Sequence, residues 1–118
     1  MVTKHKYTIK DWSDSDCQLV ESIFEKLSGK YTLLIVSILV LEGEHSFGDL
    51  RRAVPAINTK TLADRLAYLT RTGVISNRRV TEGRVNKSYY FVNSGNKEFQ
   101  FLLKAFREYG HSNFIGKV

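Results

Sequence analysis

Polar side chains that bind anions and hydrogen-bond acceptors recur at helical spacing just after the middle of the chain. They are Lys60, Thr61, Asp64, Arg65 and Tyr68. Leu62, Leu66 and Leu69 repeat at the spacing of a buried helical stripe, so the polar set falls on the opposite side. Lysine, arginine and threonine donate to phosphate oxygens, and arginine also binds base edges. The pattern predicts an amphipathic helix, about 59–72, that presents these groups to a nucleic acid; a merely solvated polar face is the alternative.

A second basic group follows in a segment typical of a β-hairpin. Its members are Arg78, Arg79, Arg84 and Lys87. β-Branched and aromatic residues fill 74–80 and 87–92, and the link between them contains glycine and asparagine. We interpret residues 74–92 as a hairpin with a basic loop that contacts phosphates or a minor groove, with a solvated hairpin as the alternative. Arg78 and Arg79 point to opposite faces of their strand, so one of the two faces the ligand.

The positive charge of the chain is concentrated in these two elements. Residues 58–89 hold seven Lys or Arg and two acidic residues, a net charge of +5 out of +6 for all 118 residues. Residues 13–28 hold four acidic residues and one lysine, a net charge of −3. A localised basic excess favours a polyanionic partner, which is nucleic acid or an anionic membrane surface. The longest apolar run, 31–41, is too short to cross a bilayer and contains Ser37, so we interpret it as a buried helix.

Patterns that indicate an enzyme or a metal site do not occur in the sequence. There is no glycine-rich phosphate loop and no His-Glu-x-x-His, and His5, His45 and His111 are far apart. Cys17 is the single cysteine, so no internal disulfide forms, which is consistent with a reducing compartment. The N-terminal segment lacks the apolar stretch of a secretory signal. We therefore expect a cytoplasmic protein without catalytic residues, metal, cofactor or membrane partner.

The remaining elements are those that position the polar groups. The length fits one domain, with a basic arm at 1–12, a folded part at 13–110 and a tail at 111–118. Asp14 or Ser15 is expected to cap a first helix. A second helix, about 31–42, is apolar nearly all round and therefore central to the core. A final helix of about 96–109 carries an apolar stripe.

A short helix and a tight turn precede the polar helix. Ser46 and Asp49 match a capping box for a helix of about 47–53, which ends before Pro55. Asn58 is a good N-cap for the next helix, and Gly73 closes it. A short helix, a turn and a longer helix make a helix-turn-helix, and the hairpin after it is a wing. Further phosphate contacts are expected from Ser46, Arg51 and Arg52, which precede the longer helix. Asn58 and Thr59, at the N-terminus of that helix, are expected to add phosphate contacts as well.

Several of these motifs, at their observed spacing, resemble the HxlR-type winged helix-turn-helix transcriptional regulators, relatives of the MarR group. Cys17 precedes GKYTLLI at 29–35, which is similar to the family's G-K-W-T-L-x-I. The segment FGDLRR at 47–52 and the residues Pro55, Ile57, Asn58 and Lys60 fall at matching places, as do Leu62, Arg65 and Leu66. GVI at 73–75 and YYFVNSG at 89–95 match the pattern that follows, so the resemblance covers about 17–95.

The resemblance implies a fold and an assembly. The fold would be α+β, mainly α: a winged helix-turn-helix with extra N- and C-terminal helices that form a homodimer. The residues expected at that interface are Val20, Phe24, Phe99, Leu102, Leu103 and Phe106. Independently, Phe101, Tyr109 and Phe114 add more apolar surface than one small core needs. A homodimer would place two recognition helices on a pseudo-palindromic site in double-stranded DNA, as a sequence-specific regulator and a repressor, with an effector that the sequence does not identify.

The chain departs from the family pattern at several positions. Tyr31 replaces a tryptophan, Asn58 a serine and Thr59 a frequent proline, and the hairpin lacks the prolines common in the family. In some relatives the cysteine matching Cys17 senses oxidants or electrophiles, whereas the neighbouring aspartates here would raise its pKa, and a small buried hydrophobe is the alternative role. Two other functions stay open: a winged-helix module for protein–protein contact, and a non-specific nucleic-acid-binding protein.

Overall fold

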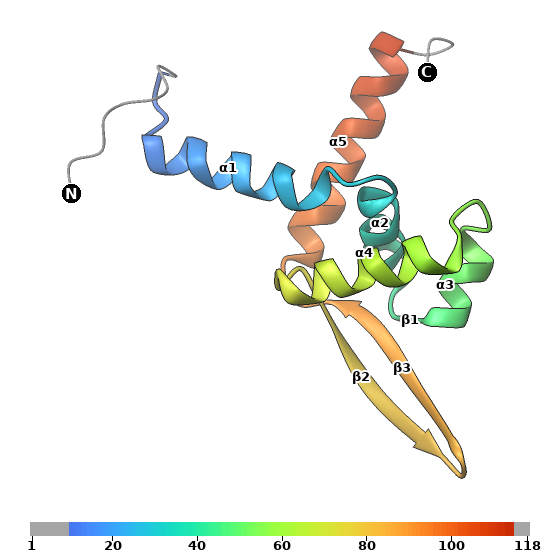
Figure 1. The fold of residues 1–118 in the computed structure, drawn as a ribbon. Coiled ribbons are helices and arrows are strands. Elements are labelled where there is room, and N and C mark those ends of the chain that lie inside the picture. The colour runs from blue at the N-terminus through green and yellow to red at the C-terminus, as the bar shows by residue number, and fades with distance from the viewer. Residues whose placement is uncertain (1–9, 115–118) are drawn as a thin grey trace.

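The computed structural model describes residues 10–114, so most of the expected N-terminal arm and residues 115–118 of the expected tail lie outside the described part. The elements are α1 (Asp14–Leu27), α2 (Thr32–Glu42), β1 (His45–Ser46), α3 (Phe47–Ala53), α4 (Thr59–Arg71), β2 (Ile75–Glu82), β3 (Val85–Val92) and α5 (Asn96–Phe114). This mainly helical α+β architecture, a helix-turn-helix followed by a hairpin wing, is the fold class expected from the sequence (Figure 1). No helix within residues 10–114 is long and apolar enough to cross a membrane.

Helix α2 forms the centre of the core, as its apolar composition predicted. Ile35 and Val36 are fully buried, and Leu39 and Val40 nearly so. The stripe of α4 packs on it through Leu62, Leu66 and Leu69. These side chains are removed from water almost completely, so α4 is held rigidly by its apolar face and only its opposite face is available for contacts.

The caps of α3 and α4 agree with the sequence prediction. The Ser46 hydroxyl accepts a hydrogen bond from the Asp49 N–H at 3.1 Å, and Asp49 accepts one from the Ser46 N–H at 3.2 Å. Asn58 Oδ1 accepts from the Thr61 N–H at 2.7 Å and begins α4. Gly73 follows α4 with φ +83, in the left-handed region that glycine adopts without strain. Side-chain caps therefore fix the N-terminal ends of both helices of the helix-turn-helix motif.

The hairpin occupies the predicted residues, but its strands are longer and its turn is tighter than predicted. We expected a loop at 81–86, whereas the strands continue to Glu82 and Val85 and leave only Gly83 and Arg84 in the turn. Gly83 has φ +60, as a two-residue hairpin turn with glycine in its first position requires. Strand β1, which the sequence did not predict because it has two residues, pairs His45 with Tyr90 and gives the antiparallel order β1-β3-β2.

The first and last helices also differ from their expected bounds. Ser13, rather than Asp14 or Ser15, is the N-cap of α1, because its hydroxyl accepts from the Asp16 N–H and completes a capping box. Helix α5 continues past the expected end at about 109 to Phe114. The Tyr109 carbonyl accepts a hydrogen bond from Asn113, and the Tyr109 and Phe114 rings lie 5.6 Å apart, so the helix holds although it contains Gly110.

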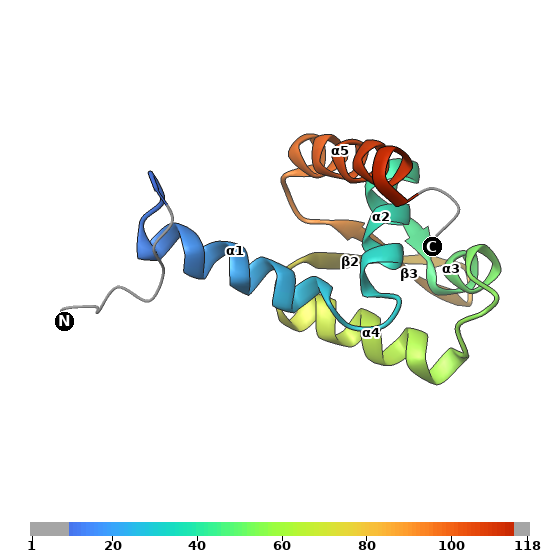
Figure 2. The ribbon, with the colours of Figure 1, turned by 90° about the horizontal axis from the view of Figure 1, so that it is seen from above.

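Helix α1 and the β2–β3 hairpin project from the body of the fold (Figure 1). Helix α1 runs outward from α2, and the β2–β3 hairpin extends on another side (Figure 1). Seen from above, α1 and α5 diverge rather than pack along their lengths (Figure 2). Cys17 is the one buried residue of α1, and α5 has none. Both helices therefore leave apolar surface open.

Candidate nucleic-acid interface

The outward face of α4 begins at its N-terminus. Thr59, Lys60 and Asp64 are exposed, and Thr61 is half-buried. Lys60 Nζ donates to Asp64 Oδ2 at 3.1 Å, an exposed pair that is weak and easily exchanged for another partner. The N–H groups at the start of a helix have no intrahelical acceptor and carry the positive end of its dipole. This end of α4 therefore presents cationic and N–H donors to an anion.

Arg65 and Tyr68, which were also predicted to contact nucleic acid, are less exposed than Lys60 and Asp64. Arg65 is half-buried, and its Nε donates to the Lys30 carbonyl at 3.0 Å, in the loop between α1 and α2. Tyr68 is half-buried against the core, and the Arg71 guanidinium lies 5.6 Å from its ring. Helical periodicity assigns Arg65 and Tyr68 to the polar face of α4. It cannot predict the hydrogen bond between Arg65 and Lys30, which are 35 residues apart in the sequence.

The two adjacent wing arginines have different surroundings. Arg78 Nε donates to Glu44 Oε2 at 3.1 Å, and its guanidinium lies 5.3 Å from the Tyr89 ring. The hydrogen bond from Arg78 lowers the pKa of Glu44 below its usual range, and the same bond raises the pKa of Arg78. Arg79 lies opposite Ser88, on the sheet face that also carries Tyr90, which packs on the core. Arg79 is thus on the helix side of the wing, and Arg78 is held on the other side.

A polar depression of about 570 Å³ separates the wing from α3. Its lining residues are Ser46, Phe47, Gly48, Arg52, Asn86, Lys87, Ser88 and Tyr90. Arg52 donates to Asp49, whose pKa is lowered first by the hydrogen bonds from Ser46 and then by Arg52. Ser46 itself is 8% exposed and its hydroxyl is used as a cap, so it offers little surface to a ligand.

Exposed cations outside any ion pair lie along the wing and on α3. Arg51, Arg79, Arg84 and Lys87 are exposed, and no ion pair among residues 10–114 engages them. Arg84 is in the hairpin turn, where nothing else of the fold packs. Exposed cations therefore lie at the N-terminal end of α4, on α3 and on the wing, whereas Arg65 and Arg78 are engaged by Lys30 and Glu44. Lys87 is on the strand face of Arg78 but also lines the depression beside α3.

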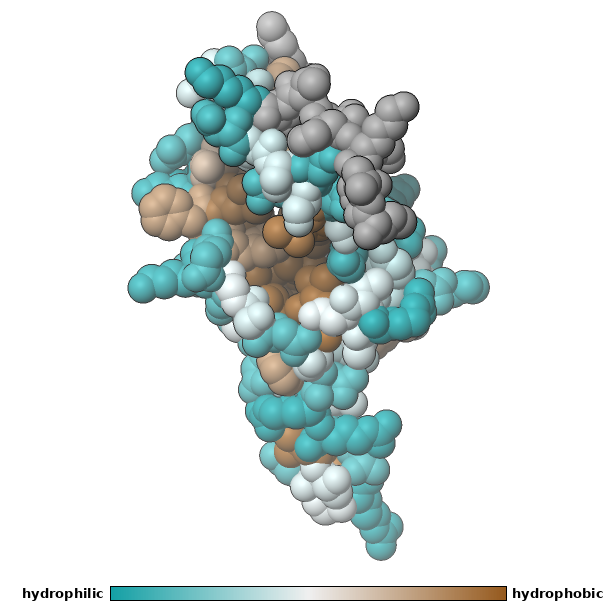
Figure 3. Space-filling model, turned by 90° about the vertical axis from the view of Figure 1, so that its left-hand side faces the viewer, coloured by the Kyte–Doolittle hydropathy of each residue, from teal (hydrophilic) through white to brown (hydrophobic). Residues whose placement is uncertain are grey.

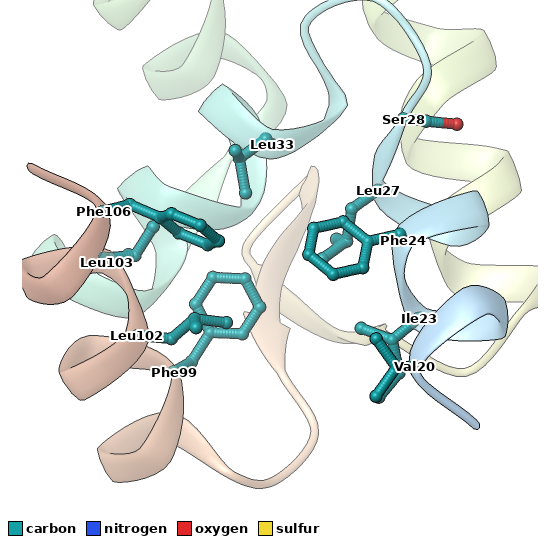
Figure 4. Close-up of a pocket in the computed structure, with 10 residues that line it drawn as sticks. All are labelled: Val20, Ile23, Phe24, Leu27, Ser28, Leu33, Phe99, Leu102, Leu103 and Phe106. Atoms are coloured by element: carbon teal, nitrogen blue, oxygen red, sulfur yellow. The ribbon is translucent and has the colours of Figure 1, made fainter. Parts of the chain in front are cut away.

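An apolar groove of about 420 Å³ lies between α1 and α5, with part of α2 at its base. Its lining residues are Val20, Ile23, Phe24, Leu27, Ser28, Leu33, Phe99, Leu102, Leu103 and Phe106. Figure 3 shows the brown hollow from outside, framed by hydrophilic residues. Phe24 and Phe106 point toward one another across it, with ring centroids 6.5 Å apart (Figure 4). All six residues predicted at a dimer interface line this groove.

The Cys17 thiol is buried, with 5% of the residue exposed. Burial raises the pKa of the thiol above its ordinary value, and the negative charges of Asp14 and Asp16 raise it further. No set of three or more His, Cys, Asp or Glu in the described ranges is arranged to hold a metal ion. The surroundings of Cys17 therefore favour the protonated thiol, which is a poor nucleophile.

This environment predicts slow alkylation of the cysteine in the native protein. Iodoacetamide at neutral pH is expected to modify Cys17 more slowly than in the urea-unfolded chain, because burial limits access to the thiol and the raised pKa lowers the fraction of thiolate. Mass spectrometry of timed samples measures both rates. Asp16→Asn, which removes one neighbouring charge, is expected to speed the native reaction. Equal native and unfolded rates would contradict the assignment.

Comparison with known proteins defines the class of this fold. The chain superposes on the reduced form of the transcriptional regulator YodB from B. subtilis with a TM-score of 0.73 and 22% identity, covering 83% of this chain and 94% of that one. A structure described as the HTH-type transcriptional regulator ytcD gives a TM-score of 0.71 at 26% identity, over 80% of this chain and 94% of that one. A MarR-family regulator from Porphyromonas gingivalis W83 gives 0.68 at 26% identity, over 89% and 100%. The fold is that of the winged helix-turn-helix regulators.

The sequence narrows this class to one family. The model of the HxlR-like helix-turn-helix family matches residues 26–117, and the chain belongs to that family. The comparison with curated proteins gives no match. Family membership confirms the resemblance expected from the motifs and places the chain among DNA-binding transcriptional regulators rather than enzymes.

Proposed function

We propose that this protein is a homodimeric repressor that binds a pseudo-palindromic operator in double-stranded DNA. The observation that carries the proposal is that α4 and the wing that follows it both present exposed cations: Lys60, Arg79, Arg84 and Lys87. Among the helices of residues 10–114, α4 is the one that the basic hairpin follows directly in the chain. A helix and wing in this arrangement fit adjacent grooves of B-DNA.

The residues of the site divide into two roles. The N-terminal half of α4, with Thr59, Lys60, Thr61 and Asp64, lies in the major groove, where Lys60 and Asp64 exchange their mutual ion pair for base or phosphate contacts. Arg79, Arg84 and Lys87 neutralise phosphates or enter the minor groove. Arg52 lines the depression beside the wing, and Arg51 and Arg52 add phosphate contacts. Asn58 and Ser46 act mainly through the helices that they cap.

The homodimer is proposed from the groove between α1 and α5. Its walls include Phe24, Leu102 and Phe106, each 42–53% exposed in the single chain. Monomeric soluble proteins rarely leave so large a continuous apolar surface open. Covering it with the same surface of a second copy would pair two α4 helices across a two-fold axis, which requires a pseudo-palindromic site.

We propose that the protein represses transcription because the surfaces described above, α4 with the wing and the groove between α1 and α5, are assigned to DNA binding and to self-association. Selection of binding sequences from random duplex DNA, followed by transcription from a promoter that contains the selected sequence, tests both specificity and sign. We expect a selected pseudo-palindrome and reduced transcription. Equal affinity for unrelated duplexes or RNA would favour a non-specific binder, and no DNA binding at low salt would favour a protein–protein module.

The wing arginines offer a matched pair of variants. Arg79→Ala is expected to weaken binding to all sequences evenly and to reduce the slope of log affinity against log salt by about 0.9, the value for one lost phosphate contact. Arg78→Ala, on the opposite face and bound to Glu44, is expected to leave the slope unchanged. Fluorescence anisotropy at several salt concentrations measures both. An equal change of slope in the two variants would contradict the assignment of Arg79 to the DNA side.

A further inference from the structure

The loop between α1 and α2 is built for close packing and holds strain. Tyr31 starts α2 with φ +67, a conformation that an aromatic residue adopts only when its surroundings enforce it. A Cβ at Gly29 would lie 2.7 Å from Thr32 Oγ1 and 3.3 Å from Arg65 Nη1, so only glycine fits without displacement. Thr32 is 1% exposed. We call residues 28–31 the joint.

Arg65 is the polar link between α4 and this joint. Its Nε donates to the Lys30 carbonyl at 3.0 Å, and its Nη1 packs over Gly29. Within residues 10–114, no other hydrogen bond or ion pair connects a side chain of α4 to the segment before α2. A guanidinium engaged in this way reaches inward to the loop, whereas a side chain that reads a base must extend from the helix.

The joint also determines where α1 lies. Helix α1 projects from the body (Figures 1 and 2) and contributes only Cys17 to the buried residues. Beyond the joint, α1 faces α5 across the open groove, where Phe24 and Phe106 meet edge to face. Contacts across this open groove restrain the direction of α1 only weakly. The direction of α1 therefore depends on the joint, the four residues that connect α1 to α2.

We propose that Arg65 is a positioning residue that couples the direction of the dimerisation helix α1 to the recognition helix α4. The proposal rests on the proposed function, in which α1 forms the dimer interface and α4 reads DNA. With the hydrogen bond between Arg65 and Lys30 in place, the separation and the angle of the two α4 helices in the dimer are fixed. The dimer then binds only operators with one distance between half-sites. Without this hydrogen bond, α1 turns about the joint and the dimer accepts several distances.

The test compares two kinds of change in the operator that wild-type protein selects from random DNA. One series inserts or deletes one base pair between half-sites, which shifts one half-site by about 3.4 Å and turns it by about 35°. The other substitutes single bases within a half-site. Wild type is expected to lose affinity about tenfold or more in the spacing series, because strained geometry prevents simultaneous engagement.

Arg65→Met keeps the stem of the side chain and removes every donor. It is expected to reduce the spacing discrimination to about threefold or less, with base preferences unchanged. Arg65→Lys, which retains one donor, is expected to restore part of it. Gly29→Ala disturbs the joint without altering α4, so it is expected to reproduce the effect, and the double variant to add nothing. Arg71→Met, the same change on the same helix, is the control and is expected to behave as wild type.

The outcomes separate the inference from the proposed function. If wild type selects no sequence or is a monomer, the proposed function fails. If wild type is a specific dimer but Arg65→Met loses preference at one base and keeps its spacing discrimination, Arg65 reads that base and the coupling is wrong. Unchanged discrimination in both Arg65→Met and Gly29→Ala also overturns it. Should Arg65→Met unfold, as circular dichroism would detect, Gly29→Ala and Arg65→Lys decide alone.

Discussion

Replacing Phe106 with aspartate is expected to convert the protein from a dimer to a monomer and to weaken operator binding about a hundredfold or more. Phe106 lines the groove between α1 and α5 and faces Phe24 across it, so an aspartate there would place a charge inside the proposed interface. Two recognition helices joined in one dimer gain roughly a hundredfold to ten-thousandfold over one, and a monomer loses that gain.

Light scattering and anisotropy with the selected operator measure mass and affinity on the same samples. Val85→Asp is the matched control for mass, because Val85 is 54% exposed on the wing, away from α1 and α5, and its variant is expected to remain a dimer. Phe106 is 45% exposed in the single chain, so the variant is expected to fold with unchanged helical circular dichroism. A dimeric Phe106→Asp protein would contradict the placement of the interface in this groove.

Leu66→Ala is expected to lower the free energy of unfolding by about 2–5 kcal/mol, a large part of the roughly 5–15 kcal/mol that a domain possesses. Leu66 is 1% exposed, between Leu62 and Leu69 in the stripe that attaches α4 to α2. Truncation removes apolar contacts and leaves a cavity, because neighbours on two helices cannot both move in. Urea unfolding at one fixed protein concentration measures the loss, since dimer stability depends on concentration.

Leu41→Ala is the matched control for this core substitution. Leu41 has the same side chain in α2 but is 61% exposed, so its truncation is expected to change the free energy of unfolding by about 0.5 kcal/mol or less. Equal losses in the two variants would mean that α4 is not anchored through its leucines. The same α4 stripe then could not hold the DNA-contacting residues in place.

Local signals in the sequence predicted the elements that position the site. The capping box of Ser46 and Asp49, the Asn58 cap and the leucine stripe of α4 depend on residues at most a few positions apart, and each has the predicted geometry. The HxlR family was also predicted from motif spacing. The length of the two wing strands was underestimated, because asparagine at 86 suggested a loop where its side chain instead accepts from Thr81 across the ladder.

Contacts between distant segments could not be predicted in this way. Arg65 bonds to Lys30 and Arg78 to Glu44, each across more than 30 residues. Helical and strand periodicity correctly placed Arg65 and Arg78 on polar faces. A polar face, however, contains side chains that bind other parts of the fold as well as side chains that remain exposed to solvent. Only the arrangement of the elements in space distinguishes Arg78 from Arg79, which are identical and adjacent in sequence.

The strand order has a consequence for the protein in the absence of DNA. Strand β2 is the edge of the sheet, with eight residues paired on one side to β3 and an open backbone on the other. Such an edge can pair with the same strand of another chain and start aggregation, and charged side chains on it oppose this. Arg78 and Arg79 lie at the middle of β2, where two facing copies would bring four guanidinium groups together. Exchanging the two arginines for β-branched residues is therefore expected to make this edge adhesive and to promote aggregation.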